Sequence, residues 1–142
     1  PPSVEYIIIF LPIDLFNTSD DEQSPKLPDK MKAIFHTITT KSLFLTRGRP
    51  DVKLGVGFAC TRVKQPNQTD YRKLKHTIMY LQETKALPLI LKTDGIGVAL
   101  YFVGAYAVHA DMKGHSGEFA TEGKGAVFSS STKQKNKLPK FN

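Results

Sequence analysis

The chain has 142 residues, of which 40% are hydrophobic and 23% are charged. This balance is ordinary for a globular protein of one domain or two small ones. Its single cysteine, Cys60, excludes an internal disulfide and is typical of a reducing compartment, so we expect an intracellular location. No apolar run reaches the roughly 20 residues that a membrane-spanning helix needs, and we expect no membrane partner.

The net charge of +7 is unevenly distributed along the chain. Residues 1–29 carry six acidic residues and one basic residue, whereas residues 30–142 carry 19 basic and seven acidic residues. A basic body favours polyanions such as nucleic acids. Because several net charges also keep a small domain soluble, the charge alone leaves both interpretations open.

The first 29 residues form an acidic segment that we expect to be partly disordered. Residues 4–15 are mostly apolar but are broken by Pro12, a pattern that allows one edge strand. Residues 17–29 are polar and acidic and contain Pro25 and Pro28, which indicates a loop or a disordered linker.

A helix is predicted after Asp29, which suits the N-cap position. Its apolar residues follow helical spacing, and Gly48 followed by Pro50 indicates its end. The predicted buried stripe consists of Met31, Ile34, Phe35, Ile38 and Leu45.

The next segment, residues 51–63, is ambiguous. Its apolar residues alternate as in a strand, but they fit a helical stripe equally well. Gly55 and Gly57 would each destabilise a helix by about 1 kcal/mol relative to Ala. Periodicity alone therefore leaves the segment open between helix and strand.

Another helix is predicted to begin at Thr69, a good N-cap residue, and its apolar stripe comprises Tyr71, Leu74, Ile78 and Leu81. Its first turns carry Arg72, Lys73, Lys75 and His76. Bases near a helix N-terminus oppose the helix dipole, so they indicate either a binding face or a solvated face.

The remainder predicts antiparallel strands. Residues 87–92 and 98–103 are separated by a turn at 94–97, and the apolar run 100–105 suggests a strand buried on both faces. We expect a turn at Gly114 and Gly117, and then a hairpin over 118–131. Lysines 133, 135, 137 and 140 read as a basic tail.

Two blocks of the sequence, residues 101–135 and residues 60–84, resemble one known family. Residues 103–117 read Val-Gly-Ala-Tyr-Ala-Val-His-Ala-Asp-Met-Lys-Gly-His-Ser-Gly, and residues 123–135 read Gly-Lys-Gly-Ala-Val-Phe-Ser-Ser-Ser-Thr-Lys-Gln-Lys. Together they resemble the start of the ribonuclease H region in copia-type (Ty1/copia) retrotransposon polyproteins. Residues 60–84 resemble the helical thumb that follows the reverse transcriptase palm in those polyproteins, and this resemblance favours a helix over 51–63.

The predicted elements, with the helix that the resemblance favours at 51–63, give an α+β fold of about three helices followed by a short antiparallel sheet. The resemblance implies that this sheet is similar to the first strands of a ribonuclease H-like fold. We therefore divide the chain into the acidic segment 1–29, a thumb-like helical region 30–86 and a truncated ribonuclease H-like sheet with a basic tail, 87–142. Such a sheet leaves an open edge and an uncovered apolar face, so we expect poor solubility or self-association through that edge.

The catalytic groups of the family do not match residues of this chain. The family's first metal-binding aspartate falls at Gly104, and its next carboxylate has no counterpart in residues 136–142. Ribonuclease H-like cleavage uses two Mg²⁺ ions, which need converging carboxylates. Asp111, Glu118 and Glu122 could in principle substitute for the missing carboxylate, but none matches a catalytic position of the family. We therefore expect no catalytic residue, no metal site and no cofactor.

The other reactive residues match no catalytic or metal-binding pattern. His109, Asp111 and His115 lie close in sequence, but their spacing matches no strong zinc pattern. Cys60 lies on an apolar face and reads as a small buried hydrophobe rather than a nucleophile. The serines at 129–131 have no identifiable base partner.

The resulting hypothesis is a degenerate, truncated polyprotein fragment, without polymerase or nuclease activity, that retains weak and non-specific binding to RNA–DNA hybrids or DNA. The alternative is a non-enzymatic module that binds nucleic acid or another protein. The residues expected to contact nucleic acid are Arg62, Lys64, Arg72, Lys73, Lys75, Lys133 and Lys135.

Overall fold

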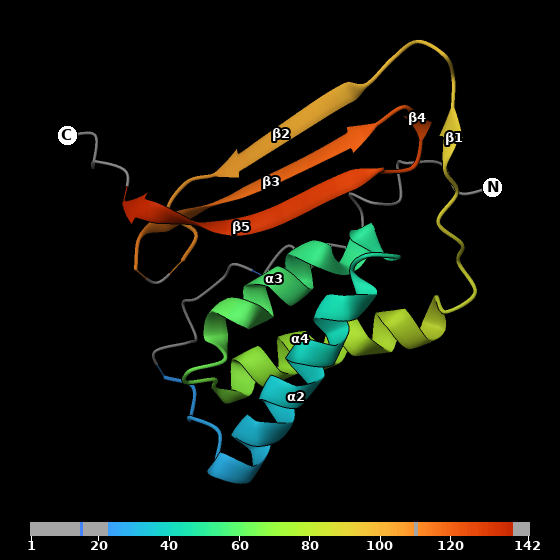
Figure 1. Ribbon diagram of the computed structural model, residues 1–142. Coiled ribbons are helices and arrows are strands. Elements are labelled where there is room, and N and C mark those ends of the chain that lie inside the picture. Colours follow the sequence, from blue (N-terminus) through green and yellow to red (C-terminus); the bar gives the residue numbers. More distant parts are fainter. Residues whose placement is uncertain (1–14, 16–22, 110, 138–142) are drawn as a thin grey trace. The chain divides into compact units, whose positions relative to one another are not determined.

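The computed structural model describes residues 15, 23–109 and 111–137, and within them helices precede strands (Figure 1). The chain divides into two compact units, here called the helical unit, which ends at Leu89, and the sheet unit, which begins at Ile90. The predicted α+β fold, with three helices followed by a short antiparallel sheet, is confirmed. The predicted edge strand over 4–15 lies outside the described residues except for its last residue.

The helical unit contains α2 (Asp29–Leu45), the short 3-10 helix η1 (Pro50–Val52), α3 (Lys53–Arg62) and α4 (Gln68–Glu83). The ambiguous segment 51–63 is therefore helical. Gly55 lies where α3 approaches α4, since a Cβ atom built on it would stand 3.0 Å from Thr77 Oγ1. This close approach offsets the poor helix propensity of glycine. No described helix has the length and apolar character to cross a membrane.

The described core of the helical unit lies between α2, α3 and α4. Phe35 of α2, Ala59 of α3 and Leu74 of α4 form its buried cluster, and the partly buried side chains packed around it are Leu27, Ile38, Val63, Tyr71 and Ile78. The stripe predicted for α4 is thus largely confirmed.

The stripe predicted for α2 is partly wrong. Ile34 and Leu45 are 45% and 52% exposed, whereas Phe35, Thr39 and Ser42 are buried. The buried residues keep helical spacing but include small polar side chains. Hydropathy does not distinguish such side chains from those on the solvent-exposed face of a helix. Small side chains let neighbouring helices pack closely.

Thr39 provides a stability test of this face. Its side chain is 1% exposed, and its hydroxyl has no hydrogen-bond partner among the described residues. A buried unpaired hydroxyl costs about 1–3 kcal/mol, so Thr39→Val, which keeps the shape, is expected to raise the free energy of unfolding by about 1 kcal/mol. Urea denaturation followed by circular dichroism measures it. Thr40→Val is the matched control, because Thr40 is exposed and bonded to the His36 carbonyl; a loss of stability in Thr39→Val would contradict the assignment.

The helix starts differ from those predicted. Pro28 rather than Asp29 occupies the N-cap of α2, and Asp29 lies in its first turn. The N-cap of α4 lies two residues earlier than predicted, at Asn67: Asn67 Oδ1 accepts from the Asp70 amide at 2.8 Å, and Asp70 Oδ2 accepts from the Asn67 amide at 3.0 Å. This reciprocal cap satisfies two amides at once, which Thr69 does not do.

Part of the predicted linker is anchored to the α3–α4 connection. The Leu27 amide donates to the Pro66 carbonyl and the Gln68 amide donates to the Pro25 carbonyl, both at 3.0 Å. Thr69, the predicted cap, instead bonds Ser24 through its hydroxyl at 3.0 Å. Backbone pairing that local sequence does not reveal therefore orders residues 24–27.

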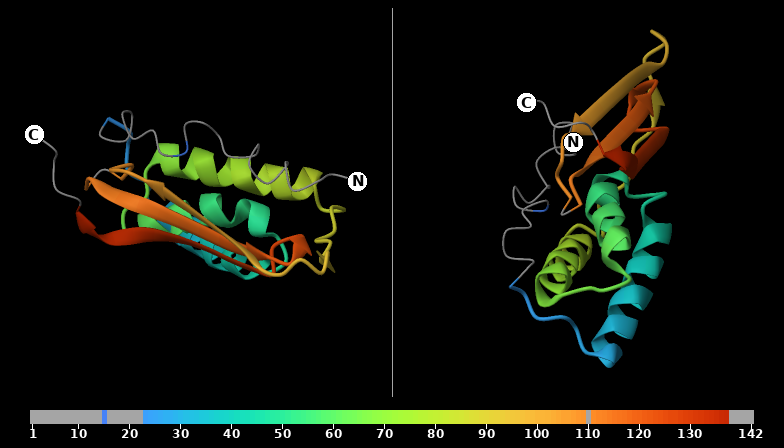
Figure 2. Two further views of the ribbon diagram at one scale, coloured as in Figure 1. Left: turned by 90° about the horizontal axis from the view of Figure 1, so that it is seen from above. Right: turned by 90° about the vertical axis from the view of Figure 1, so that its left-hand side faces the viewer.

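The sheet unit is built on three antiparallel strands in the order β2-β3-β5, drawn side by side in Figure 2. They are β2 (Ala99–Ala105), β3 (Lys113–Thr121) and β5 (Phe128–Lys137). The two-residue strand β1 (Lys92–Thr93) pairs with β4 (Gly123–Lys124). The predicted pairing of 87–92 with 98–103 is therefore wrong, whereas the pairing of 118–121 with residues near 128–131 is confirmed.

The turn between the first two long strands also differs from the prediction. Gly114 and Gly117 lie inside β3, and the chain reverses before it, where Ala107 and Met112 adopt positive φ angles of 49° and 60°. Lys133 and Lys135 belong to β5 rather than to a tail. Lys140 lies outside the described residues.

The expectation that β2 is buried on both faces is wrong. Leu100, Phe102 and Val103 are 62%, 72% and 67% exposed. β2 occupies an edge of its sheet, so its side chains have a strand neighbour on one side among the described strands. An apolar run thus marks an open edge here, in agreement with the expected uncovered apolar surface.

Candidate functional site

The first group of predicted contact residues meets at the α3–α4 connection. Arg62 Nε lies 2.9 Å from Asp70 Oδ1, and the Asp70 side chain is 1% exposed. The Arg62 guanidinium stands 5.7 Å from the centroid of the Phe58 ring, and Lys73 Nζ stands 5.0 Å from the same ring. Arg62 and Lys73 therefore help to hold the helices together.

Lys64, Arg72 and Lys75 are instead exposed. Arg72 and Lys75 are three residues apart on α4, so they share its solvent face. Lys64 follows α3 directly, and Arg72 makes a long contact of 3.4 Å with the Thr69 hydroxyl. These three cations present charge to solvent, while Arg62 and Lys73 pack beneath them.

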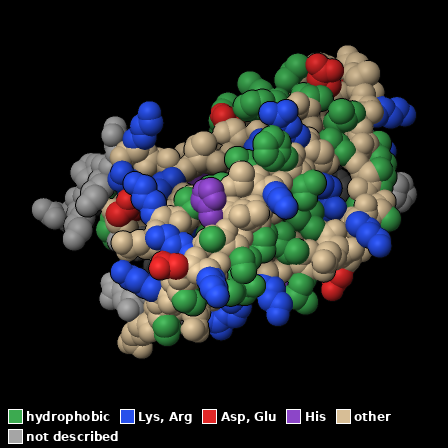
Figure 3. Space-filling model, turned by 60° about the horizontal axis from the view of Figure 1, so that its bottom comes forward, with side chains coloured by type: hydrophobic (Ala, Val, Ile, Leu, Met, Phe, Trp, Pro, Cys, Tyr) green, Lys and Arg blue, Asp and Glu red, His purple; other side chains and the backbone are tan. Residues whose placement is uncertain are grey.

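Positive charge is concentrated in the helical unit. Residues 30–89 contain 12 basic and three acidic residues, and two of the acids, Asp51 and Asp70, form ion pairs with Arg49 and Arg62. The third acidic residue of this range is Glu83. Lys and Arg side chains are spread over the face drawn in Figure 3, with few acidic ones among them.

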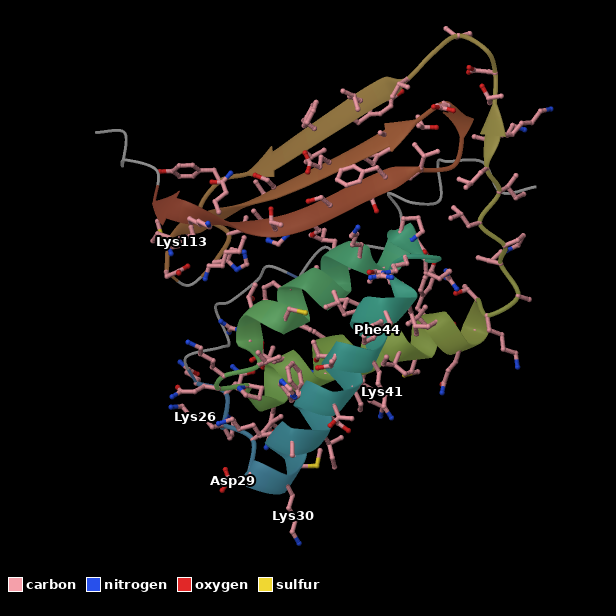
Figure 4. All side chains as sticks on the ribbon, in the orientation of Figure 1. Lys26, Asp29, Lys30, Lys41, Phe44 and Lys113 are labelled. Atoms are coloured by element: carbon pink, nitrogen blue, oxygen red, sulfur yellow. The ribbon has the colours of Figure 1, made fainter. Side chains whose placement is uncertain are left out.

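An open groove lies beside this charge. It is lined by residues at the starts of α2 and α4, namely Leu27, Pro28, Met31, Gln68, Tyr71 and Arg72. Lys26 and Lys30 project near the start of α2 in Figure 4. The groove therefore offers one aromatic ring and apolar lining next to cations, a combination that suits a base and its phosphate.

Arg49 ties η1 to the end of α4. Its guanidinium binds Asp51 Oδ2 at 2.7 Å, the Thr84 hydroxyl at 2.7 Å and the Thr84 carbonyl at 3.0 Å. Burial raises the pKa of Asp51, but hydrogen bonds from Arg49 and Tyr80 outweigh burial and leave that pKa below its usual value. These contacts connect η1 to the end of α4, and the Arg49 guanidinium is engaged in them instead of facing solvent.

Lys133 and Lys135 form a separate group on β5 in the sheet unit. Lys133 Nζ lies 2.8 Å from Asp111 Oδ2, while Lys135 is exposed. Burial raises the pKa of Asp111, but interactions with Lys133 and Lys113 lower that pKa by more than burial raises it. The Asp111 carboxylate therefore interacts mainly with these two lysines.

Gly104 lies in β2 opposite Ser116, and a Cβ atom built on it would meet nothing within 4 Å. The family's aspartate would therefore fit there sterically. Within the described residues, no three His, Cys, Asp or Glu side chains gather as a metal site would require. Glu118 lies opposite Phe102 in the register, and Glu122 is exposed. The expected absence of a metal site stays a prediction.

A buried histidine pair was missed by sequence reasoning. His109 Nε2 lies 3.0 Å from His115 Nδ1, and His115 Nε2 lies 2.8 Å from Ser131 Oγ. Ser131 thus has a base partner, which the sequence did not reveal, because only the β3–β5 register places it beside His115. The two imidazoles are 4% and 3% exposed, whereas Ser131 is partly buried.

The His115 environment predicts a pH dependence. Burial lowers the pKa of His115, and the nearby Lys133 lowers it further. Because the unfolded chain then binds the proton more tightly, stability is full above about pH 6.5 and declines as the pH falls below that value. His109 contacts the same imidazole, while Asp111 and Lys113 surround Lys133.

The measurement is the thermal midpoint of the chain at neutral and mildly acidic pH. His115→Gln, which can still bond Ser131, is expected to flatten the decline, whereas substitution of the exposed His36 by Gln is expected to leave it unchanged. Equal pH dependence in both variants would show that His115 does not carry the effect.

Cys60 is a half-buried free cysteine, and burial raises the pKa of its thiol. A thiol with a raised pKa is a weak nucleophile, which agrees with the interpretation of Cys60 as a small hydrophobe.

Comparison with known proteins gives no match: no family model, no curated protein and no solved structure is significantly similar to this chain. The resemblance to copia-type polyproteins thus rests on the two sequence blocks alone.

Proposed function

We propose that this chain is a catalytically inactive relative of the reverse transcriptase and ribonuclease H regions of copia-type retrotransposon polyproteins, and that it binds RNA–DNA hybrids or DNA weakly and without sequence preference. The observation that carries the binding proposal is the unbalanced positive charge of residues 30–89, which contain 12 basic and three acidic residues. Such a surface releases counterions from a phosphate backbone and binds it regardless of sequence.

The contact surface in this proposal consists of Lys64, Arg72 and Lys75, with Tyr71 in the adjoining groove. The three cations supply phosphate contacts, and the aromatic ring offers a stacking surface. Arg62 and Lys73 support this surface from beneath through Phe58 and Asp70. Lys133 and Lys135 are proposed as a separate phosphate contact of the sheet unit.

The proposed lack of activity rests on Gly104. Hydrolysis with two Mg²⁺ ions needs carboxylates that converge on the metals, and glycine supplies none at the position where the family has aspartate. The open space around Gly104 shows that steric crowding does not explain the missing side chain.

The experiment is binding to an RNA–DNA hybrid over a range of salt concentrations, with Mg²⁺ present and the RNA strand labelled. We expect an affinity that falls steeply with salt, similar affinity for unrelated sequences, and intact RNA. Cleaved RNA would refute the inactive assignment, and absence of binding at low salt would refute the binding surface.

The alternative is a protein-interaction module without a nucleic-acid partner. The exposed apolar side chains of β2 favour it. It predicts no salt-dependent binding to the hybrid, so the same titration separates the two functions.

A further inference from the structure

The two edges of the three-stranded sheet differ in chemistry. β5, at one edge, carries Lys133 and Lys135 among polar residues, and charged residues are a common protection against edge pairing. β2, at the other edge, reads ALYFVGA and contains neither charge nor proline. Its four large side chains are between 50% and 72% exposed. Among the described residues, β2 is therefore the edge chemically open to another strand.

We propose that the strand added to β2 is β2 of a second copy of this chain, paired antiparallel about a two-fold axis at Phe102. In this register Phe102 faces its own copy, Tyr101 faces Val103, and Leu100 faces Gly104. Every pair is uncharged, and all seven residues of the strand take part. The dimer joins two three-stranded sheets into one of six strands.

Charge selects this partner over the other arrangements. Each copy has a net charge of +7, so two copies repel each other, and a contact through a neutral surface adds the least to this repulsion. Pairing β5 with β5 would set lysines opposite lysines, which is unfavourable. Pairing β2 with β5 is heterologous and leaves free edges that continue to grow, whereas the two-fold contact closes after one addition.

The size of the contact predicts a weak dimer. A fully exposed aromatic side chain offers roughly 150–250 Å². Tyr101 and Phe102 are 50% and 72% exposed, so the aromatic residues of two copies can bury on the order of 500 Å² together. Leu100 and Val103 bring the contact closer to the roughly 1,000 Å² that specific interfaces need. We therefore expect dimerisation to depend on protein concentration.

The first test is sedimentation velocity of the whole chain, freed of nucleic acid by nuclease, over a wide range of concentration. We expect a monomer–dimer equilibrium that Phe102→Lys abolishes. Phe128→Lys is the matched control, because Phe128 is 55% exposed at the start of β5 and its substitution should leave the dimer intact. A monomer at every concentration, or a dimer that persists in Phe102→Lys, would overturn the proposal.

The second test fixes the register by disulfide formation in a Cys60→Ala background. Directly opposed residues of antiparallel strands have Cα atoms about 4.5–5.5 Å apart, which a disulfide can span. Phe102→Cys is therefore expected to cross-link two copies under mild oxidation. Leu100→Cys should not, since the two cysteines would be four residues apart along the strands, about 13 Å. Equal cross-linking of both variants, or species larger than a dimer, would overturn the two-fold register.

Discussion

Arg62→Met is expected to lower the free energy of unfolding by about 3 kcal/mol. Arg62 is the ion-pair partner of Asp70, whose side chain is 1% exposed, and removing one partner leaves a buried charge uncompensated. The Arg62 side chain is 21% exposed, which places the expected loss at the lower end of the range for buried pairs. The same substitution also removes the guanidinium from the Phe58 ring.

Urea denaturation followed by helical circular dichroism measures the loss. Arg72→Met is the matched control: it removes the same group from an exposed position of α4 and is expected to change stability by less than about 0.5 kcal/mol. Adding Asp70→Asn to Arg62→Met should recover part of the loss, because the amide can still cap Asn67 without carrying a charge. A loss in Arg62→Met no greater than in the control would contradict the structural role of the pair.

The combined variant Lys64→Gln, Arg72→Gln and Lys75→Gln is expected to weaken hybrid binding by on the order of 100-fold at 0.1 M salt. Each phosphate contact contributes about 0.9 to the slope of log affinity against log salt, so the slope should fall by about 2.7. Arg62 and Lys73 are left in place because their loss would also disturb the packing around Phe58.

The control for this variant removes equal charge from other exposed positions: Lys41→Gln in α2, Lys85→Gln after α4 and Lys92→Gln in β1. It should lower affinity far less, because a general field of charge contributes less than direct contacts. Fluorescence anisotropy with a labelled hybrid measures both. Equal losses in the two variants would show that net charge, and not the proposed surface, governs binding.

The helices could be predicted from the sequence, but the residues at which they begin were predicted less accurately. Apolar spacing indicated α2 and α4, and the family resemblance resolved the segment that became α3. The N-cap of α4 depends on two hydrogen bonds between Asn67 and Asp70. The hydroxyl of Thr69, the predicted cap, instead forms a hydrogen bond with the Ser24 hydroxyl. That competition involves residues 45 positions apart, which local rules do not include.

The candidate site was predicted as one set of seven cations, but the structure divides it by role. The composition and the distribution of charged residues along the chain determined that the part after the acidic N-terminal segment is basic, because counts of charged residues do not depend on conformation. Only the tertiary structure decided that Arg62 and Lys73 are engaged in packing while Lys64, Arg72 and Lys75 are exposed, since burial is set by which helices meet. Likewise, the sequence established that 99–105 is apolar and extended, but strand order made it an exposed edge instead of a buried strand.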